Sequence, residues 1–118
     1  MKYMLMIYGP EDGWDDQTRT ECYVESAELA QTLAEEGSFI ATAPLESVVT
    51  AKSVRIREGK IQVTDGPFAE TREQLGGFFL VEAGSMDEAL TIAERIPGAR
   101  VGTVEVRKVV DVPGLPGQ

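Results

Sequence analysis

Residues that could do chemistry are concentrated at positions 64–78 of the 118-residue sequence. This segment holds a Gly66-Pro67 turn, four charged side chains and a Gly-Gly pair between two strand-like runs. Asp65, directly before the turn, is the candidate catalytic residue, because a carboxylate at the mouth of a cavity can act as an acid, a base or a ligand anchor. The alternative is structural, since an aspartate in this position can accept hydrogen bonds from the backbone N–H groups of the turn.

Three further charged residues follow Asp65 in the same segment: Glu70, Arg72 and Glu73. A carboxylate works as a general base only if burial or a neighbouring like charge raises its pKa toward the working pH. These residues could supply such a charged neighbourhood, and Arg72 is a candidate ligand contact. The alternative for all three is a solvated loop surface.

The last predicted strand carries a second candidate pair, Glu105 and Arg107. Residues 103, 105 and 107 alternate with Val104 and Val106, and alternate residues of a strand point to opposite faces of a sheet. If the valines pack under the helices, Glu105 and Arg107 point into a cavity, where they can orient a carboxylate or carbonyl ligand. The same pair could instead be a structural ion pair that fixes the register of a dimer.

Two tyrosines of the first predicted strand are candidate walls of this cavity. Tyr3 and Tyr8 lie on opposite faces of the strand, so only one of them can line it. Burial in the core is the alternative for each. Cys22, at an apolar helical position, is interpreted as a small core residue.

Two absences restrict the chemistry. The sequence contains no histidine and a single cysteine, which excludes Ser-His and Cys-His nucleophile systems, an intrachain disulfide and a thiolate zinc site. Catalysis, if present, must use Asp, Glu, Lys, Arg, Tyr or backbone groups. We expect neither a metal nor an organic cofactor.

The charge and hydropathy of the chain narrow its partners and location. Twenty acidic and eleven basic residues give a net charge of −9, which disfavours nucleic acid and favours small molecules or other proteins. No apolar run reaches the roughly 20 residues that cross a bilayer. The short apolar N-terminal run lacks a cleavage site and is interpreted as a strand. We therefore expect a cytoplasmic protein without membrane contact.

The periodicity predicts one domain over residues 1–110 and a flexible tail over 111–118. Thr18 and Glu21 have the spacing of a capping box for the first helix, and Gly37 is suited to end it. Ser85 and Glu88 form a second capping box. The predicted elements are a strand at 2–8, a helix at 17–36 with Cys22, Tyr23, Leu29, Ala30 and Leu33 on its apolar side, a strand at 39–43, a hairpin of 53–57 and 60–64 with one exposed face, a strand at 77–82, a helix from 86 that ends by Pro97, and a strand at 101–109.

This order of elements predicts a ferredoxin-like α+β domain with an antiparallel sheet and both helices on one face. The opposite face of the sheet then needs a cover, and self-association is the natural solution. Two such sheets facing each other make a dimeric α+β barrel with a cavity between them. We therefore expect a homodimer.

The run DGPFAETREQLGGF at residues 65–78 resembles the signature of the DGPF proteins, a branch of the YCII-related family. The resemblance extends to KYMLMIYG at 2–9 and GTVEVR at 102–107. It implies a ferredoxin-like dimer whose active-site cleft lies between the strands and the partner, with an aspartate in the motif region. Some relatives are thought to use a His–Asp pair in elimination from a ring compound, a mechanism that a chain without histidine cannot share. Arg72 stands where relatives usually have lysine.

Two functional hypotheses follow. The first is a protein that binds a small polar or aromatic molecule in an inter-sheet cavity, with Asp65, Glu105 and Arg107 as contacts and proton-transfer or elimination chemistry by a carboxylate. The second is a non-enzymatic interaction module. DGPF proteins are often encoded beside extracytoplasmic-function sigma factors, so the resemblance implies a transcription-related partner for that module. A packed barrel without a cavity is a third possibility, and the sequence leaves open whether the chain is an enzyme.

Overall fold

The computed structural model describes residues 1–12, 15–69 and 71–117 of the chain. It has a four-stranded antiparallel sheet in the order β2-β5-β1-β6 and a separate two-stranded sheet of β3 and β4. One helix follows β1 and one follows β5, which is the ferredoxin-like arrangement that the sequence predicts. The elements of the main domain are β1 (Lys2–Gly9), α1 (Asp16–Glu35), β2 (Phe39–Pro44), β5 (Gln74–Glu82), α2 (Met86–Ala93) and β6 (Thr103–Lys108), with short 3₁₀ turns at Val48–Thr50 and Pro97–Arg100.

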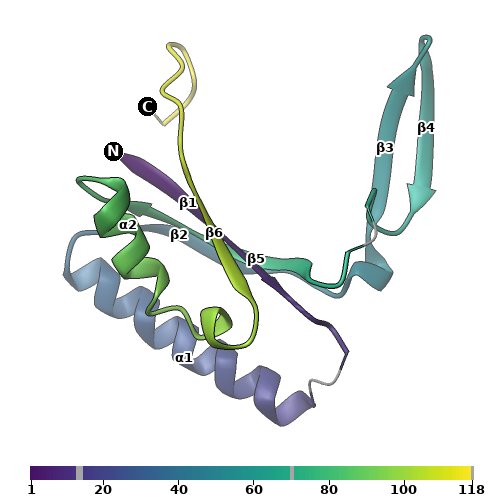
Figure 1. Cartoon of the computed structure of the whole chain (residues 1–118). Coiled ribbons are helices and arrows are strands. Elements are labelled where there is room, and N and C mark those ends of the chain that lie inside the picture. The colour runs from purple at the N-terminus through teal and green to yellow at the C-terminus, as the bar shows by residue number, and fades with distance from the viewer. Residues whose placement is uncertain (13–14, 70, 118) are drawn as a thin grey trace.

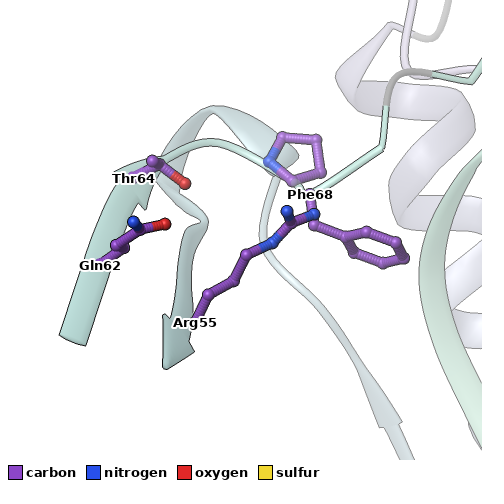
Figure 2. A pocket seen from close by; sticks show the side chains of 5 residues that line it. Arg55, Gln62, Thr64 and Phe68 are labelled. Atoms are coloured by element: carbon purple, nitrogen blue, oxygen red, sulfur yellow. The ribbon is translucent and has the colours of Figure 1, made fainter. Parts of the chain in front are cut away.

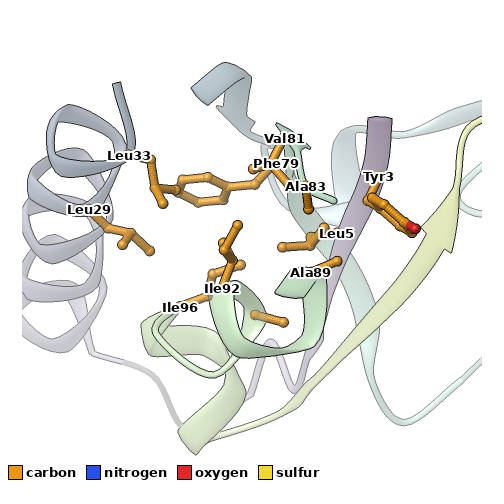
Figure 3. Close-up of a cluster of buried hydrophobic side chains, with 11 residues drawn as sticks. Tyr3, Leu5, Leu29, Leu33, Phe79, Val81, Ala83, Ala89, Ile92 and Ile96 are labelled. Carbon is orange, nitrogen blue, oxygen red and sulfur yellow. The ribbon is translucent and has the colours of Figure 1, made fainter. Parts of the chain in front are cut away.

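Both helices cover the same face of the main sheet (Figure 1). Leu29 and Leu33 of α1 and Ile92 of α2 are buried together with Leu5 and Phe79 of the sheet (Figure 3). Removing these side chains from water is the main force that holds helices and sheet together. The rest of the cluster consists of Tyr3, Val81, Ala83, Ala89, Ala93 and Ile96.

Side-chain caps set the ends of both helices. The N-cap of α1 is Asp15, whose carboxylate accepts a hydrogen bond from the Thr18 N–H at 2.7 Å, so the predicted capping box from Thr18 to Glu21 is wrong. Asp15 competes better because an ionised carboxylate suits the positive end of the helix. Gly37, with a φ of 82°, follows α1 as predicted.

The second predicted capping box is confirmed. The Ser85 side chain accepts a hydrogen bond from the Glu88 N–H at 3.2 Å, while the Glu88 carboxylate accepts one from the Gly84 N–H at 2.6 Å. Tyr23, expected on the apolar side of α1, is instead 48% exposed. Cys22 is half-buried, short of the full burial expected of a core residue.

The hairpin of β3 (Lys52–Arg57) and β4 (Lys60–Asp65) stands away from the helices, beyond the uncovered face of the main sheet (Figure 1). It turns at Glu58-Gly59, where both residues have positive φ, as a type I′ hairpin turn requires. The hairpin was predicted with one exposed face. In the described chain all strand residues of the hairpin except the half-buried Ser53 are exposed, so both faces are exposed, and β3 and β4 pair only with each other.

Candidate functional site

The face of the main sheet opposite the helices carries the candidate site. Val104 and Val106 pack against the core, which meets the condition set by the sequence pattern, so Thr103, Glu105 and Arg107 point to the opposite face. We call this the open face, because no helix of the described residues lies over it (Figure 1). It is defined by Met4, Met6, Tyr8, Phe78, Leu80, Thr103, Glu105 and Arg107.

The middle of the open face is apolar. Met4 lies opposite Leu80 of β5, and Met6 lies opposite Phe78. All four side chains are only partly buried, although they sit on the two central strands. Solvated methionine and phenylalanine on adjacent strands form a flat apolar floor suited to a ring or to another sheet.

The polar groups of the open face lie along its β6 edge. On β1, Met4 lies opposite Arg107 and Met6 opposite Glu105, so both charges flank the apolar floor. Among the ion pairs of the described residues, none includes Glu105 or Arg107. Glu105 and Arg107 therefore form no ion pair with each other in the described chain, and both side chains remain free for a ligand or a partner. The alternative of an ion pair that fixes the register of a dimer stays a prediction.

A carboxylate and a hydroxyl meet at the Tyr8 end of the open face. The Thr103 hydroxyl donates to the two Glu73 oxygens at 3.0 and 3.3 Å. Thr103 lies directly opposite Tyr8 on β1, and Gly9 lies opposite Gln74, the neighbour of Glu73. The contact therefore spans β1 and places the Glu73 carboxylate on the open face.

A backbone irregularity explains how Glu73 reaches this position. Ile7 pairs with Gly77 and Tyr8 pairs with Leu75, so Gly76 is the extra residue of a β-bulge. A Cβ on Gly77 would stand 2.9 Å from the Ala43 carbonyl oxygen, which makes this position a close approach. Gly76 is thus the bulge residue and Gly77 the site of close approach between β5 and β2. The bulge bends the start of β5 and re-aims the residues before it.

Asp65 lies elsewhere, at the base of the hairpin. Its carboxylate, 86% exposed, accepts a hydrogen bond from Lys52 Nζ at 2.6 Å. The turn that follows is held by the Gly66 N–H, which donates to the Ala51 carbonyl at 2.7 Å. Asp65 belongs to the two-stranded sheet, whereas Glu105 and Arg107 belong to the main sheet, and no described contact joins them.

The remaining sequence candidates fall in different places. Tyr3 is 3% exposed in the helix-side core, so Tyr8 is the tyrosine that lies on the open face. Arg72 is exposed in the loop before β5. Glu70 lies outside the described residues. Sequence reasoning missed Thr103 as a site residue and considered Glu73 only as a neighbour of Asp65, although the parity of Thr103 with Glu105 was a usable signal.

Two hollows lie away from the open face. One, of about 160 Å³, lies beside the base of the hairpin and is lined by Arg55, Gln62, Thr64, Pro67 and Phe68 (Figure 2). The other is a groove of about 540 Å³ beside α1, whose lining includes Cys22, Glu25 and Arg100. Within the described ranges, acidic and cysteine side chains nowhere gather in the groups of three that could hold a metal ion. No helix there is long and apolar enough to cross a membrane.

Comparison with known proteins finds a matching family model, a related sequence and a related solved structure. Residues 1–113 match the family model of the YCII-related domain. An uncharacterized protein of Rhizobium meliloti is 33% identical over 112 residues, which cover 91% of this chain and 90% of that protein. Among solved structures, the 5-chloro-2-hydroxyhydroquinone dehydrochlorinase of Burkholderia phenoliruptrix, in complex with 2,5-dihydroxybenzoquinone, matches with a TM-score of 0.55. It is 15% identical, covers 93% of this chain and 94% of its own, and shows the shared fold.

Proposed function

The chain belongs to the YCII-related family, and from this premise we propose that it binds a small polar or aromatic molecule on the open face, enclosed by a second copy of the chain. The observation that carries the proposal is the apolar floor of Met4, Met6, Phe78 and Leu80 beside the unpaired Glu105 and Arg107. An apolar surface with a few convergent polar groups is the usual form of a ligand site.

The second copy supplies the other wall of the site. A sheet covered on one face only leaves its second face to be covered by association. The partly buried floor residues would gain burial if two open faces packed together. The resulting homodimer would hold a cavity between its sheets, with one set of polar groups at each β6 edge.

The chemistry of the open face selects a class of ligand. A planar ring can lie on the methionine and phenylalanine side chains. The Arg107 guanidinium can bind an anionic oxygen of that ring, and Tyr8 and Thr103 can hydrogen-bond to its hydroxyl or carbonyl groups. The solved neighbour binds 2,5-dihydroxybenzoquinone, which makes hydroxylated quinones the first class to test here.

A carboxylate of the open face would serve as the acid or base. Glu73 is the stronger candidate, because its hydrogen bonds to Thr103 hold it in one orientation beside Tyr8. In an elimination it would take a proton from the ring, and the released electron pair would form the new double bond as the leaving group departs. Asp65, exposed and paired with Lys52, would then hold the hairpin ends together.

Ligand binding by neighbouring β6 variants tests this function. Arg107→Gln removes a positive charge from the open face, and Lys108→Gln removes one from the adjacent residue on the other face. With 2,5-dihydroxybenzoquinone as the probe, Arg107→Gln should weaken binding by about tenfold or more, as expected for a charged hydrogen bond. Lys108→Gln should bind like the parent. Equal affinity of the two variants would contradict the proposed site.

An interaction module remains the second candidate, favoured by the exposed hairpin and the net charge of −9. Its partner would be a transcription-related protein. If the chain is such a module, hydroxylated quinones and related acids should not raise its Tm. The module also requires a purified, identified partner whose binding is lost in Val54→Asp. A ligand response that depends on Arg107 would count against it.

A further inference from the structure

One face of the hairpin is apolar and uncovered. Val54 lies opposite Val63, and Ile56 lies opposite Ile61, so the four side chains share one face. They are 61–72% exposed. We call them the valine-isoleucine face. The other face is polar, and Arg55, Gln62 and Thr64 point to that side, beside the hollow at Phe68 (Figure 2).

An uncovered face of this kind is unusual for a two-stranded sheet. An isolated hairpin is at best marginally stable in water, and β-branched residues stabilise a strand chiefly when neighbours pack against them. In the described chain β3 and β4 bond only to each other, and the hairpin projects from the body of the domain (Figure 1). The hairpin therefore needs a cover from another molecule.

The charge of the hairpin favours a second copy of the chain as the molecule that covers the valine-isoleucine face. Four of the eleven basic residues and two of the twenty acidic residues lie in the hairpin, which carries a net charge of +2. The rest of the chain then carries −11. Arg55, Arg57 and Lys60 lie on the polar face, and Lys52 is paired with Asp65. The basic charge therefore steers the arm toward the acidic body of a second copy, while the apolar face makes the contact.

We propose that the hairpin is an arm that docks its valine-isoleucine face on a second copy of this chain. The hairpin projects beyond the open face, on the side where the proposed second sheet would lie (Figure 1). The inference rests on the proposed function only for the existence of a dimer. It requires no ligand, and it adds a contact that pairing of the two open faces does not include.

Two adjacent substitutions test the arm. Ile61→Asp places a charge on the valine-isoleucine face, and Gln62→Asp places the same charge on the polar face, beside Arg55. We expect Ile61→Asp to raise the dimer dissociation constant by about tenfold or more, as loss of one buried isoleucine would. Gln62→Asp should leave it within about twofold. Sedimentation equilibrium of the full chain measures both.

Equal dissociation constants for Ile61→Asp and Gln62→Asp, or a parent chain that stays monomeric, would overturn the proposal. Because Lys52 and Asp65 are paired, residues 53–64 can also be replaced by a Gly-Gly turn. That deletion should leave the main sheet folded by circular dichroism and weaken the dimer as Ile61→Asp does. A deletion variant that dimerises like the parent would refute the arm.

A third variant separates this inference from the proposed function. Met6→Asp charges the open face without touching the hairpin. If it leaves the dimer intact while Ile61→Asp dissociates it, pairing of the open faces is wrong and the arm stands. If only Met6→Asp dissociates the dimer, the arm is wrong and the open-face site stands.

Discussion

The hydroxyl of Thr103 donates to the carboxylate of Glu73 at 3.0 Å, which joins two residues 30 positions apart across β1. This contact ties the end of the 64–78 segment to the first residue of β6. It brings the Glu73 carboxylate to the open face, close to Tyr8. The segment thus contributes to the candidate site through Glu73, whereas its most conspicuous acid, Asp65, lies on the hairpin.

Removing the Thr103 hydroxyl should weaken both the fold and the site. Thr103→Val keeps the shape and β propensity of the side chain but leaves the Glu73 carboxylate without its donor. We expect the free energy of unfolding in urea to fall by about 1 kcal/mol. Affinity for 2,5-dihydroxybenzoquinone should fall as well. The control is Thr42→Val, which removes a hydroxyl that donates to the Phe78 carbonyl and should alter stability alone.

Gly102 should tolerate no side chain, because it brings Thr103 beside Tyr8. A Cβ at this position would stand 2.0 Å from the Tyr8 carbonyl oxygen, and the backbone would have to move. Gly102→Ala should lower the free energy of unfolding by about 2 kcal/mol, the usual cost of such overpacking. Gly9→Ala is the matched control, since a Cβ there meets no atom within 4 Å. Equal stabilities of the two variants would contradict the close approach of Gly102 to the Tyr8 carbonyl oxygen.

Cys22 should react slowly with thiol reagents at neutral pH. Burial raises the pKa of its thiol above the usual value, and the Glu25 carboxylate raises it further, while Arg100 acts in the opposite direction. Because the thiolate is the reactive form, a raised pKa moves the rise in rate to higher pH. Glu25→Gln should therefore shift the rate profile toward lower pH, and Glu35→Gln, near the other end of α1, should not. A parent profile like that of a free thiol would contradict this environment.

Strand periodicity accounts for what could be predicted from the sequence. The alternation of Val104 and Val106 with Glu105 and Arg107 predicted correctly that the valines lie on one face of the sheet and the charged residues on the other. The positions of Tyr3 and Tyr8 in the first strand predicted correctly that only one of them lies on the open face. Such patterns are local, since each depends on one strand.

The contact between Glu73 and Thr103 could not be predicted in this way. It depends on a strand order that puts β1 between β5 and β6, and on a bulge at Gly76 that shifts the register by one residue. The capping residue predicted for α1 was wrong, although the helix itself was placed to within one residue, because Asp15 and Thr18 are both acceptable N-caps and only the tertiary structure decides between them. Asp65 was expected at a cavity because the sequence predicts the turn that follows it. The direction in which the hairpin projects from the main sheet could not be predicted, and that direction carries Asp65 away from the open face.

The four methionines provide the most direct test of the open-face site. Met4 and Met6 lie on its floor, whereas Met1 and Met86 lie at the N-terminus and at the start of α2. The protein carries ¹³C-labelled methionine methyl groups and Cys22→Ser, which removes a thiol that could add to a quinone ring. In this protein, 2,5-dihydroxybenzoquinone should shift the Met4 and Met6 signals. The Met1 and Met86 signals should stay in place. Binding that leaves Met4 and Met6 unchanged, or that shifts Met86 instead, would contradict a ligand site on the open face.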